Sequence, residues 1–510
     1  MRKSADRVDT ANSTNSMNGL PGTTAASSVQ EAQMRTMLAM PTQTHPHGRG
    51  RQCFDLTILA ALGAASIALW RFIQPWGVLA DHAAAFIPVF SALLLVYFLA
   101  VGWLFGRKMH GRSVFIVLFV IAIAARFVMI QQIPTASDDI YRYVWDGRVQ
   151  AAGINPYRYP PNDPALASLH DPKIFPDINR PNVRTIYPPV AEVVFRLVFA
   201  LHPNSVTWTK YAFSLVDLAV AVLLASILRR MGLNPALVIV YLWHPLLVLE
   251  VAHSGHVDIV AVLLLLLAIE ARRTGRQTVA GVLCAAAVLV KFYVFAALPA
   301  LMSGGLRRRE FRLPLAFAAS VALAYLPFLS VGTHVFGFLG GYAAEEGFAS
   351  GVRYFLLTQA LQKLHPLDRG ISAWYTHSPL HVLTPTAVYT GLMLVVLAVV
   401  SLWCLLRPPS QADTAAIANR VAVLLLLLFT FTTSSQPWYL LVLLVCVPLV
   451  ARPLAVACSI AVACAPYGYL HWWFDKRPIW PWWVEYDGRA IALLIVVIWG
   501  ISRLRQHAGN

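Results

Sequence analysis

Long apolar runs separated by short polar segments dominate the sequence between residues 54 and 503. A helix needs about 20 apolar residues to cross a hydrocarbon core of about 30 Å. Runs of this length, or close to it, lie at 54–72, 85–105, 114–133, 207–228, 235–252, 257–270, 311–330, 381–405, 418–434, 437–450, 453–470 and 488–503. Because a chain in lipid must satisfy its backbone hydrogen bonds internally, these runs predict an all-α polytopic membrane protein with about twelve spans.

Basic clusters between the runs indicate which ends face the cytoplasm. They are GRKMHGR after the second run, RRMG after the fourth and ARRTGR after the sixth, with single arginines at the same ends of later runs: Arg407, Arg420, Arg452 and Arg503. Cytoplasmic loops carry an excess of Lys and Arg. Both termini are therefore expected in the cytoplasm, with large outer loops at 134–206 and 331–380.

Two segments do not fit simple spans. VAEVVFRLVFALH, residues 190–202, is too short to cross a bilayer and contains Glu192 and Arg196, so we expect a helix lying in the membrane interface. Residues 278–303 are long enough for one crossing, but that would leave the following cluster GGLRRREFR outside. Two half-helices that enter and leave from the cytoplasm, with Lys291 near their tip, satisfy the charge rule; such a break is tolerated where it lines a cavity.

Composition supports the membrane class. The chain of 510 residues is 58% hydrophobic and 13% charged, whereas soluble domains carry about 25% charged residues. The net charge of +16 comes mostly from the clusters between runs, which argues against nucleic-acid binding. Residues 1–52 are rich in Ser, Thr, Asn and Gly, and we expect a disordered cytoplasmic tail ahead of a transmembrane domain at 53–505. Five of the six cysteines lie in apolar runs, which predicts core residues and no disulfide framework.

The stretch SDDIYRYVWDGRVQAAGINPY, residues 137–157, places charged and aromatic residues directly after the third run. On a helix, Asp139 would share a face with Tyr143, and Asp138 with Arg142, since residues i and i+4 are neighbours. We therefore expect the two carboxylates to point in different directions, one free for catalysis and the other tethered to a cation. The alternative is a solvated helix start, because acids suit the first turn of a helix.

A second polar group lies at the predicted outer end of the fifth run, in WHPLLVLEVAHSGHVD. It contains Glu250, His253, His256 and Asp258. The last three have the donor types of a metal site. The alternative is a helix-capping turn with hydrogen-bonded imidazoles.

Two further interruptions are chemically unusual. Lys291 in LVKFYVF is a lone cation within an apolar run, where ionisable residues are usually functional. SSQPWYLL, residues 434–441, breaks the chain at a proline and presents Gln436, Trp438 and Tyr439. An aromatic belt at the membrane surface is the structural alternative for these rings.

These motifs, in this order and on the predicted outer face, resemble the bacterial polyprenol-phosphate-sugar-dependent glycosyltransferases of the GT-C class, and most closely the integral-membrane mannosyltransferases that act on cell-envelope glycolipids. The resemblance covers the architecture of most of residues 54–503 and, in sequence, DIYRYVWDGRVQAAGINPY, HSGHVD, VKFY and QPWYLL. It implies a catalytic base at the start of the first large outer loop. The pattern D-[IV]-Y-x-Y then corresponds to Asp139, Tyr141 and Tyr143, with Asp138 as the neighbouring alternative.

The resemblance also implies that GINPY, residues 153–157, lines the active-site cavity. The family often shows NGHND where this chain has SGHVD, which keeps His256 and Asp258 but lacks an amide. The predicted substrate-binding residues are Tyr141, Arg142, Tyr143, Asn155, Tyr157, Arg184, Tyr187, His253, His256, Asp258, Lys291, Gln436, Trp438 and Tyr439. Four of them are candidates to stabilise charge on a leaving phosphate: Arg142, Arg184, Lys291 and His253.

The implied function is transfer of a hexose, with mannose expected, from a polyprenyl-phosphate donor to a cell-envelope lipid or glycan. The reaction would occur with inversion on the outer face of the bacterial inner membrane. No Gly-rich phosphate loop or metal-type DxD motif is found in the sequence, which favours a lipid-borne donor over a nucleotide sugar. No cofactor is expected; a divalent metal is possible but not required. The main rival is a secondary transporter or lipid flippase, which would concentrate its polar residues near the midplane and show two related halves. An inactive scaffold subunit would have no use for the Asp138–Asp139 pair.

Overall fold

The computed structural model describes residues 49–337, 339–345, 347–348, 351, 354, 356–357, 384–408, 413–432, 436–469 and 484–508. Every regular element in these ranges is helical. Residues 1–48, most of the second predicted outer loop and the tryptophan-rich segment 470–483 lie outside the described residues. The first described element, α2, begins at Arg49, within the segment 1–52 predicted as a tail.

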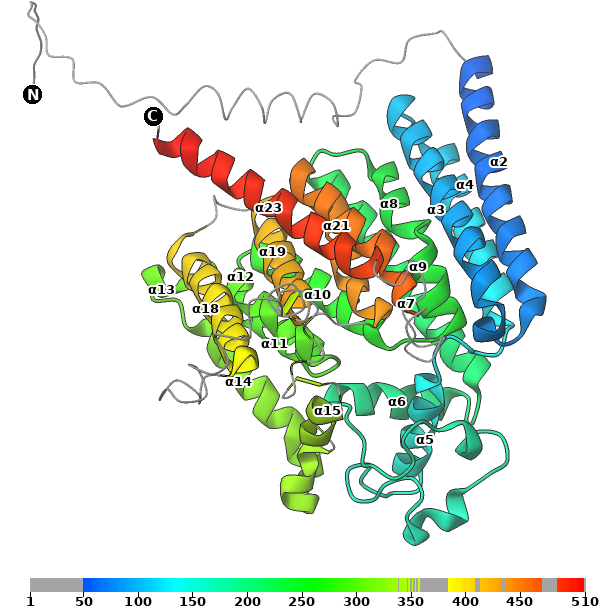
Figure 1. The fold of residues 1–510 in the computed structure, drawn as a ribbon, viewed down its shortest axis with the longest axis vertical. Helices are drawn as coiled ribbons and strands as arrows, with labels where there is room; N and C mark the ends of the chain where they lie inside the picture. Colours follow the sequence, from blue (N-terminus) through cyan, green and yellow to red (C-terminus); the bar gives the residue numbers. More distant parts are fainter. Residues whose placement is uncertain are drawn as a thin grey trace, which may run out of the picture.

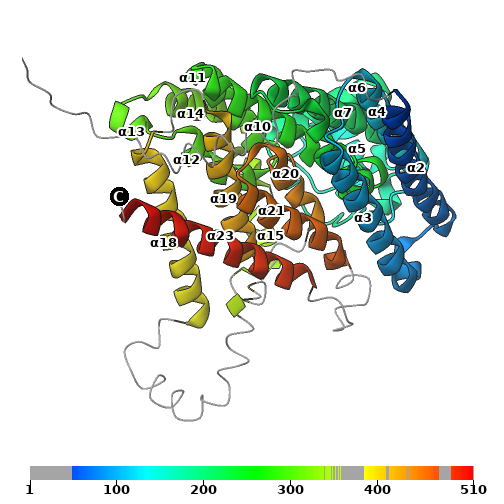
Figure 2. The same ribbon diagram turned by 90° about the horizontal axis from the view of Figure 1, so that it is seen from above.

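Three long helices form one flank of the molecule (Figure 1). They are α2 (Arg49–Ile73), α3 (Ala83–Gly106) and α4 (Arg112–Ile130), and they match the first three predicted spans. α2 packs against both α3 and α4. Seen from above, this flank lies at the opposite end of the molecule from α18 (Pro385–Leu406) (Figure 2).

A buried ion pair joins this flank to the centre of the molecule. Arg126 of α4 donates from Nε to Asp217 Oδ2 at 2.5 Å, and Asp217 lies on α7 (Val206–Arg230). The Tyr241 hydroxyl donates to the other carboxylate oxygen at 2.7 Å. Both charged side chains are almost fully buried, so each compensates the desolvation of the other.

The first large loop is an ordered helical layer at the lower end of Figure 1. It contains α5 (Asp139–Ala151), two 3₁₀ turns η3 (Pro164–Leu169) and η4 (Phe175–Asp177), and α6 (Pro189–Leu201). α5 packs tightly on α6 because Gly147 has no side chain: a Cβ there would lie 2.8 Å from the Phe195 carbonyl oxygen.

The predicted fifth span is broken. Residues Pro235–Leu242 and Pro245–His253 form two helical pieces that meet at an angle of 56°. The first piece consists of η5 (Pro235–Val238) and α8 (Ile239–Leu242), and the second of α9 (Pro245–Leu247) and the π-helical turn η6 (Val248–His253). Pro245 explains the bend, since proline removes a helix hydrogen bond and clashes with the preceding turn. α10 (Asp258–Arg273) follows after a tight turn.

The segment predicted as two half-helices is broken at the predicted place. α11 (Gln277–Val288) ends just before Lys291, whose backbone is extended with φ −145° and ψ 117°. The 3₁₀ helix η7 (Phe292–Ala297) and the short α12 (Leu298–Leu301) then continue the chain.

The two ends of this segment lie next to each other. Arg272, just before α11, donates to the carbonyl oxygens of Leu301 and Ser303 at 2.7 and 3.1 Å. Gln277 donates to Glu310 Oε2 at 3.2 Å. These contacts are those of a hairpin that enters and leaves from one face, with Lys291 at its tip.

The remaining described elements complete the bundle around this hairpin. They are α13 (Gly305–Arg308), α14 (Arg312–Tyr325), η8 (Leu326–Phe336), α15 (Leu339–Glu345), α18, α19 (Thr414–Thr432), η11 (Pro437–Leu440), α20 (Leu441–Leu444), η12 (Val447–Leu449), α21 (Arg452–Cys464), η13 (Ala465–Gly468) and α23 (Val484–Ala508). In the described ranges seven helices are long and apolar enough to cross a membrane, or eight if the bent pair counts as one span. The count of about twelve expected from apolar length is therefore not confirmed. Shorter apolar helices occupy the later predicted runs Pro437–Leu449 and Arg452–Gly468.

The basic loops meet at one end of the molecule, which we name the basic face. Asn234, next to RRMG, donates to the carbonyl oxygen of Met109 in GRKMHGR at 2.6 Å. Arg230 pairs with Glu270 beside ARRTGR. Arg420 donates to the Arg407 carbonyl oxygen at 2.6 Å. The layer of α5 and α6 lies at the opposite end of the molecule (Figure 1).

A labelling experiment tests the hairpin. Arg276→Cys and Arg308→Cys, each in a Cys53→Ser background, place exposed thiols at the two ends of the segment. Both should react with a membrane-impermeant maleimide from the same side of the membrane, while Asn162→Cys in the first loop reacts from the other side. Labelling of the two end positions from opposite sides would show a single crossing instead.

Candidate active site

The Asp138–Asp139 pair opens α5 and is held by an amide that the sequence motifs do not include. Asn179 donates from Nδ2 to Asp138 Oδ1 at 2.9 Å and to Asp139 Oδ1 at 2.7 Å. Arg142, which shares a helix face with Asp138, pairs with Asp146 instead, at 2.9 Å. Asp139 keeps 19% of its side chain exposed, so it is fixed in position and still accessible.

Asp138 faces more open surroundings. Partial removal from water and the neighbouring Asp139 carboxylate raise its pKa, while Asn179 and Arg180 act in the opposite direction. Arg180 has a left-handed backbone with φ 46°, an uncommon conformation for a residue other than glycine. Its guanidinium lies 5.7 Å from the centre of the Tyr342 ring on α15.

His256 lies between two carboxylates. Its Nδ1 is 3.9 Å from Asp139 Oδ2, and its Nε2 is 3.3 Å from Glu250 Oε2. The imidazole stacks on Trp438, with ring centres 3.9 Å apart and an interplanar angle of 15°. His256 and Glu250 are completely buried.

The turn that carries His256 can approach α5 because Gly255 precedes it. Gly255 has φ 72°, and a Cβ there would lie 2.3 Å from the Cδ1 atom of Ile140, next to Asp139. The motif SGHVD therefore requires a glycine for both its backbone conformation and its contact with α5.

Lys291 at the hairpin tip forms the cationic part of the site. Its Nζ lies 3.2 Å from Asp258 Oδ2, and the Tyr293 hydroxyl donates to Asp258 Oδ1 at 2.8 Å. The rings of Tyr187 and Tyr439 flank the ammonium at 5.3 and 5.4 Å, within the range of a cation–π interaction. This arrangement explains why the helix breaks here: the break directs the only charge of the run toward partners.

The four sequence motifs thus meet in one cluster. α5 contributes Asp139, the turn before α10 contributes His256, the hairpin contributes Lys291, and η11 contributes Trp438 and Tyr439. Gln436 is nearly buried at the start of η11. α15 also contributes to the cluster: its Tyr342 hydroxyl lies 3.2 Å from the Tyr439 hydroxyl.

The donor set does not form a metal site. The described residues contain no group of three or more His, Cys, Asp or Glu side chains that could hold a metal ion. His253 accepts a hydrogen bond from the Thr135 backbone N–H at 3.2 Å, while Asp258 binds Lys291 and Tyr293. The three predicted donor residues of this turn therefore have separate partners.

Several predicted substrate-binding residues support the loop instead of facing the cluster. Asn155 donates to the Phe328 carbonyl oxygen at 3.0 Å, and the Tyr157 hydroxyl to the Tyr187 carbonyl oxygen at 2.7 Å. Arg184 donates from Nε to the Arg158 carbonyl oxygen at 3.1 Å. Two further residues of this group are tyrosines. Tyr141 lies beside Asp177, and Tyr143 stacks on Phe195 with ring centres 4.5 Å apart.

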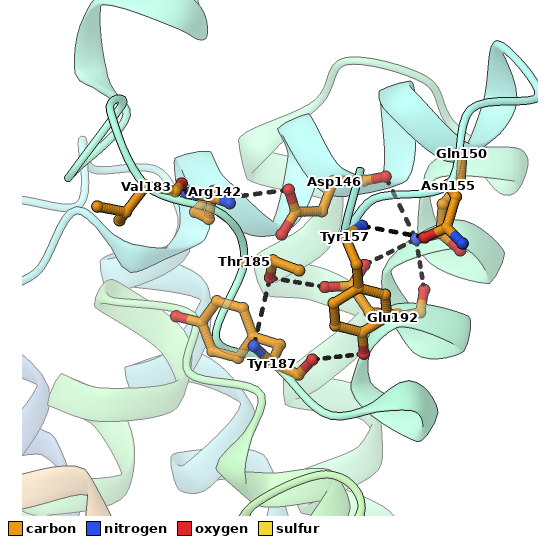
Figure 3. Close-up of polar contacts among 9 residues, drawn as sticks. All are labelled: Arg142, Asp146, Gln150, Asn155, Tyr157, Val183, Thr185, Tyr187 and Glu192. Carbon is orange, nitrogen blue, oxygen red and sulfur yellow. Dashed lines mark hydrogen bonds and ion pairs between the residues drawn. The ribbon is translucent and has the colours of Figure 1, made fainter. Parts of the chain in front are cut away.

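A buried polar network holds α5 and α6 together (Figure 3). Glu192 is completely buried; it accepts from the Thr185 hydroxyl at 2.8 Å and from Gln150 Nε2 at 2.9 Å. Asp146, also buried, faces the same cluster and binds Arg142. Burial, followed by the Asp146 carboxylate, raises the pKa of Glu192 well above its ordinary value. The sequence indicated only that Glu192 interrupts an apolar helix.

Two family models match the chain. One is described as Alpha-(1->6)-mannopyranosyltransferase, N-terminal domain, and matches residues 53–304; the other is Glycosyltransferase family 87 and matches residues 185–435. The curated protein Alpha-(1->6)-mannopyranosyltransferase A of Mycobacterium tuberculosis is 25% identical over 350 residues. The chain is similar to these glycosyltransferases, and the matches support a glycosyltransferase of the GT-C class.

The chain spans part of that relative. The alignment covers 66% of this chain and 63% of the mycobacterial protein, so it includes less than two thirds of the relative's length. No solved structure matches the chain. The matches favour glycosyl transfer over the transporter or flippase alternative.

The buried carboxyl network predicts a pH-dependent stability. Because the pKa of Glu192 is raised in the folded protein, its contribution to stability is fully present below its unfolded pKa of about 4.3 and is lost as the pH rises through the folded value. The melting temperature in detergent should therefore fall as the pH rises from about 4.3 toward the folded pKa of Glu192. The melting temperature of the Glu192→Gln variant should fall less over this interval. The control is Asp163→Asn, which keeps the cap of η3, and equal falls in all three proteins would refute the prediction.

Proposed function

We propose that the protein transfers mannose from a polyprenyl-phosphate donor to a hydroxyl group of a cell-envelope lipid or glycan, with inversion at the anomeric carbon. The observation that carries the proposal is Asp139: an accessible carboxylate, held by Asn179, inside a cluster of cations and aromatic rings. The printed activity of the mycobacterial relative, mannopyranosyl transfer, supports mannose as the sugar.

Burial distinguishes the base from the other carboxylates of the cluster. Glu250 and Asp258 are completely buried, so neither can reach a substrate hydroxyl. Asp138 is accessible, but of the two adjacent carboxylates it is Asp139 that lies beside His256 in the cluster. Asp139 is therefore the group that takes the proton as the acceptor hydroxyl attacks, a contribution typically worth about 10²–10⁴-fold in rate.

The leaving phosphate needs cations, since negative charge builds on its oxygens as the sugar–oxygen bond breaks. Three other residues were predicted from the sequence to stabilise this charge: Arg142, Arg184 and His253. Each of them binds a partner within the protein. Lys291 is paired with Asp258 but retains 11% side-chain exposure at the centre of the cluster, between the rings of Tyr187 and Tyr439. We assign the phosphate to Lys291.

The site lies at the end of the molecule away from the basic face. The positive-inside rule favours a cytoplasmic basic face, which supports a site on the outer side of the bacterial inner membrane with both termini in the cytoplasm. A donor whose sugar is linked to a lipid fits this location, because the bilayer delivers the head group to the outer surface.

The base assignment predicts a strong asymmetry between the two aspartates. In membranes that contain matched amounts of protein, Asp139→Asn should lower transfer of radiolabelled mannose from polyprenyl-phosphate-mannose by about 10²-fold or more, because the amide cannot accept the proton. Asp138→Asn should retain most of the activity, since it keeps an oxygen that accepts from Asn179.

Asp163→Asn, in the same loop, serves as the control for an ordinary carboxylate. Wild-type activity of the Asp139→Asn variant would show that Asp139 does not act as the base. Failure of the wild type to transfer any of several lipid-linked sugars would return the transporter alternative to first place.

The role of Lys291 can be separated from its structural pairing. Lys291→Met alone leaves Asp258 buried without its cation, so reduced stability is expected together with lost activity. Lys291→Met combined with Asp258→Asn removes both charges and should recover the melting temperature toward that of the wild type. Transfer should stay at least about tenfold reduced, because the phosphate still lacks its cation. Recovery of transfer in the double variant would show that Lys291 acts only through folding.

A further inference from the structure

Arginines gather at the part of the basic face where the hairpin ends. The segment GGLRRREFR, residues 304–312, contains α13, and its residues 307–309 are exposed arginines. Its one carboxylate, Glu310, accepts a hydrogen bond from Gln277. Other arginines of the basic face have carboxylate partners, since Arg230 and Arg273 both pair with Glu270. The segment after the hairpin therefore carries more positive charge than its own acids balance.

A close backbone contact brings this segment to the end of α18. The Gly304 N–H donates to the Cys404 carbonyl oxygen at 3.1 Å. Gly304 has φ 73°, and a Cβ there would lie 2.5 Å from the Cα atom of Pro408, so this contact requires a glycine. α13 consequently lies against the end of α18 that carries Arg407 (Figures 1 and 2).

Two further guanidinium groups reach this place from neighbouring helices. Arg420 of α19 donates to the Arg407 carbonyl oxygen at 2.6 Å, and its guanidinium lies 4.9 Å from the centre of the Trp403 ring. Arg272, at the end of α10, is nine-tenths buried and donates to backbone carbonyl oxygens at the end of the hairpin. The charges of Arg308 and Arg420 both act on that of Arg272. Like charges from separate elements thus lie within electrostatic range of one another.

We name these four residues the arginine corner: Arg272, Arg308, Arg407 and Arg420. Helix ends explain in part why they are there, because cations suit the carbonyl end of a helix. Carbonyl oxygens are neutral, however, and do not balance the charge. The acids of the adjoining segments are Glu310 and Asp413, and Asp413 caps α19 by accepting from the Ala415 N–H at 2.9 Å. Two carboxylates leave the four guanidinium groups with an excess of positive charge.

Apolar side chains flank the arginine corner. Four of them are 44% to 54% exposed: Leu306, Phe311, Trp403 and Leu406. The guanidinium group matches the geometry of a phosphate, to which it can donate two parallel hydrogen bonds. A phosphate that belongs to a lipid also brings acyl chains, which pack against apolar side chains of this kind. The combination of clustered arginines and exposed apolar groups therefore fits a phospholipid better than a free anion.

We propose that the arginine corner binds the head group of an anionic phospholipid in the leaflet that adjoins the basic face. The general attraction between basic loops and anionic lipids acts on every arginine of this face. Here the guanidinium groups converge from α10, α13, α18 and α19, which makes a site for one head group. A lipid bound there holds together the two ends of the hairpin whose tip carries Lys291.

Binding is measured on the purified, delipidated full-length protein in a neutral detergent. The probes are phosphatidylglycerol and, with the same acyl chains, zwitterionic phosphatidylcholine. Phosphatidylglycerol should raise the melting temperature and stay bound in native mass spectrometry, because a ligand of the folded state stabilises it. Phosphatidylcholine at the same concentration should do neither. Inorganic phosphate, which lacks acyl chains, should not raise the melting temperature at that concentration.

Two variants test the site itself. Arg308→Gln and Arg407→Gln remove charge from exposed side chains and leave the backbone hydrogen bonds of both residues in place. Each should weaken the binding of phosphatidylglycerol about fivefold, the effect typical of one basic residue next to an anionic lipid. The control is Arg112→Gln, which removes the same charge from an exposed residue of α4, on the flank opposite α18 (Figure 2). This variant should bind with wild-type affinity.

Each contrary outcome overturns a defined part of the proposal. Equal stabilisation by the two lipids would show that the phosphate charge is not recognised, and equal stabilisation by inorganic phosphate would exclude a lipid-specific site. Equal weakening by Arg112→Gln and Arg308→Gln would show that binding follows the total charge of the protein. Wild-type affinity in the folded Arg308→Gln/Arg407→Gln protein would remove the arginine corner as the site. None of these measurements uses mannosyl transfer, so the lipid site and the proposed function stand or fall separately.

Discussion

The ion pair between Lys291 and Asp258 is the interaction on which the site depends. A cation and a carboxylate withdrawn from water are stable only when they compensate each other, and these two connect the hairpin tip to the start of α10. Asp258 follows directly after the turn that carries His256, and Lys291 lies between the rings of Tyr187 and Tyr439. One pairing therefore sets the relative positions of the outer loop, the turn and η11.

The first outer loop is ordered for a different reason, which is hydrogen bonding within a buried layer. Glu192 joins α6 to Gln150 of α5 and to Thr185 of the connecting segment. Asn155 reaches across to the carbonyl oxygen of Phe328. The loop can therefore hold Asp139 in a defined place although it lies outside the apolar helices. Polar side chains, which are rare inside a membrane protein, here both stabilise the loop and form the candidate active site.

Sequence reasoning predicted those parts of the fold that depend on local pattern. The long spans at α2, α3, α4 and α7 follow from apolar length, and the break at Lys291 follows from the charge rule. It did not predict partners that are distant along the chain. Asn179 lies 40 residues after Asp139, and Tyr469 lies 219 residues after Glu250. Arg142, predicted as a substrate ligand, pairs with Asp146 one turn further on.

The length of α11 has a consequence for the depth of the reaction. α11 has 12 residues, which gives a rise of at most about 18 Å at 1.5 Å per residue. A hydrocarbon core is about 30 Å thick, so a half-helix that starts at the inner boundary brings Lys291 to a level still inside the bilayer. On the proposed function, the anionic head of the donor would then meet Lys291 below the plane of the other head groups.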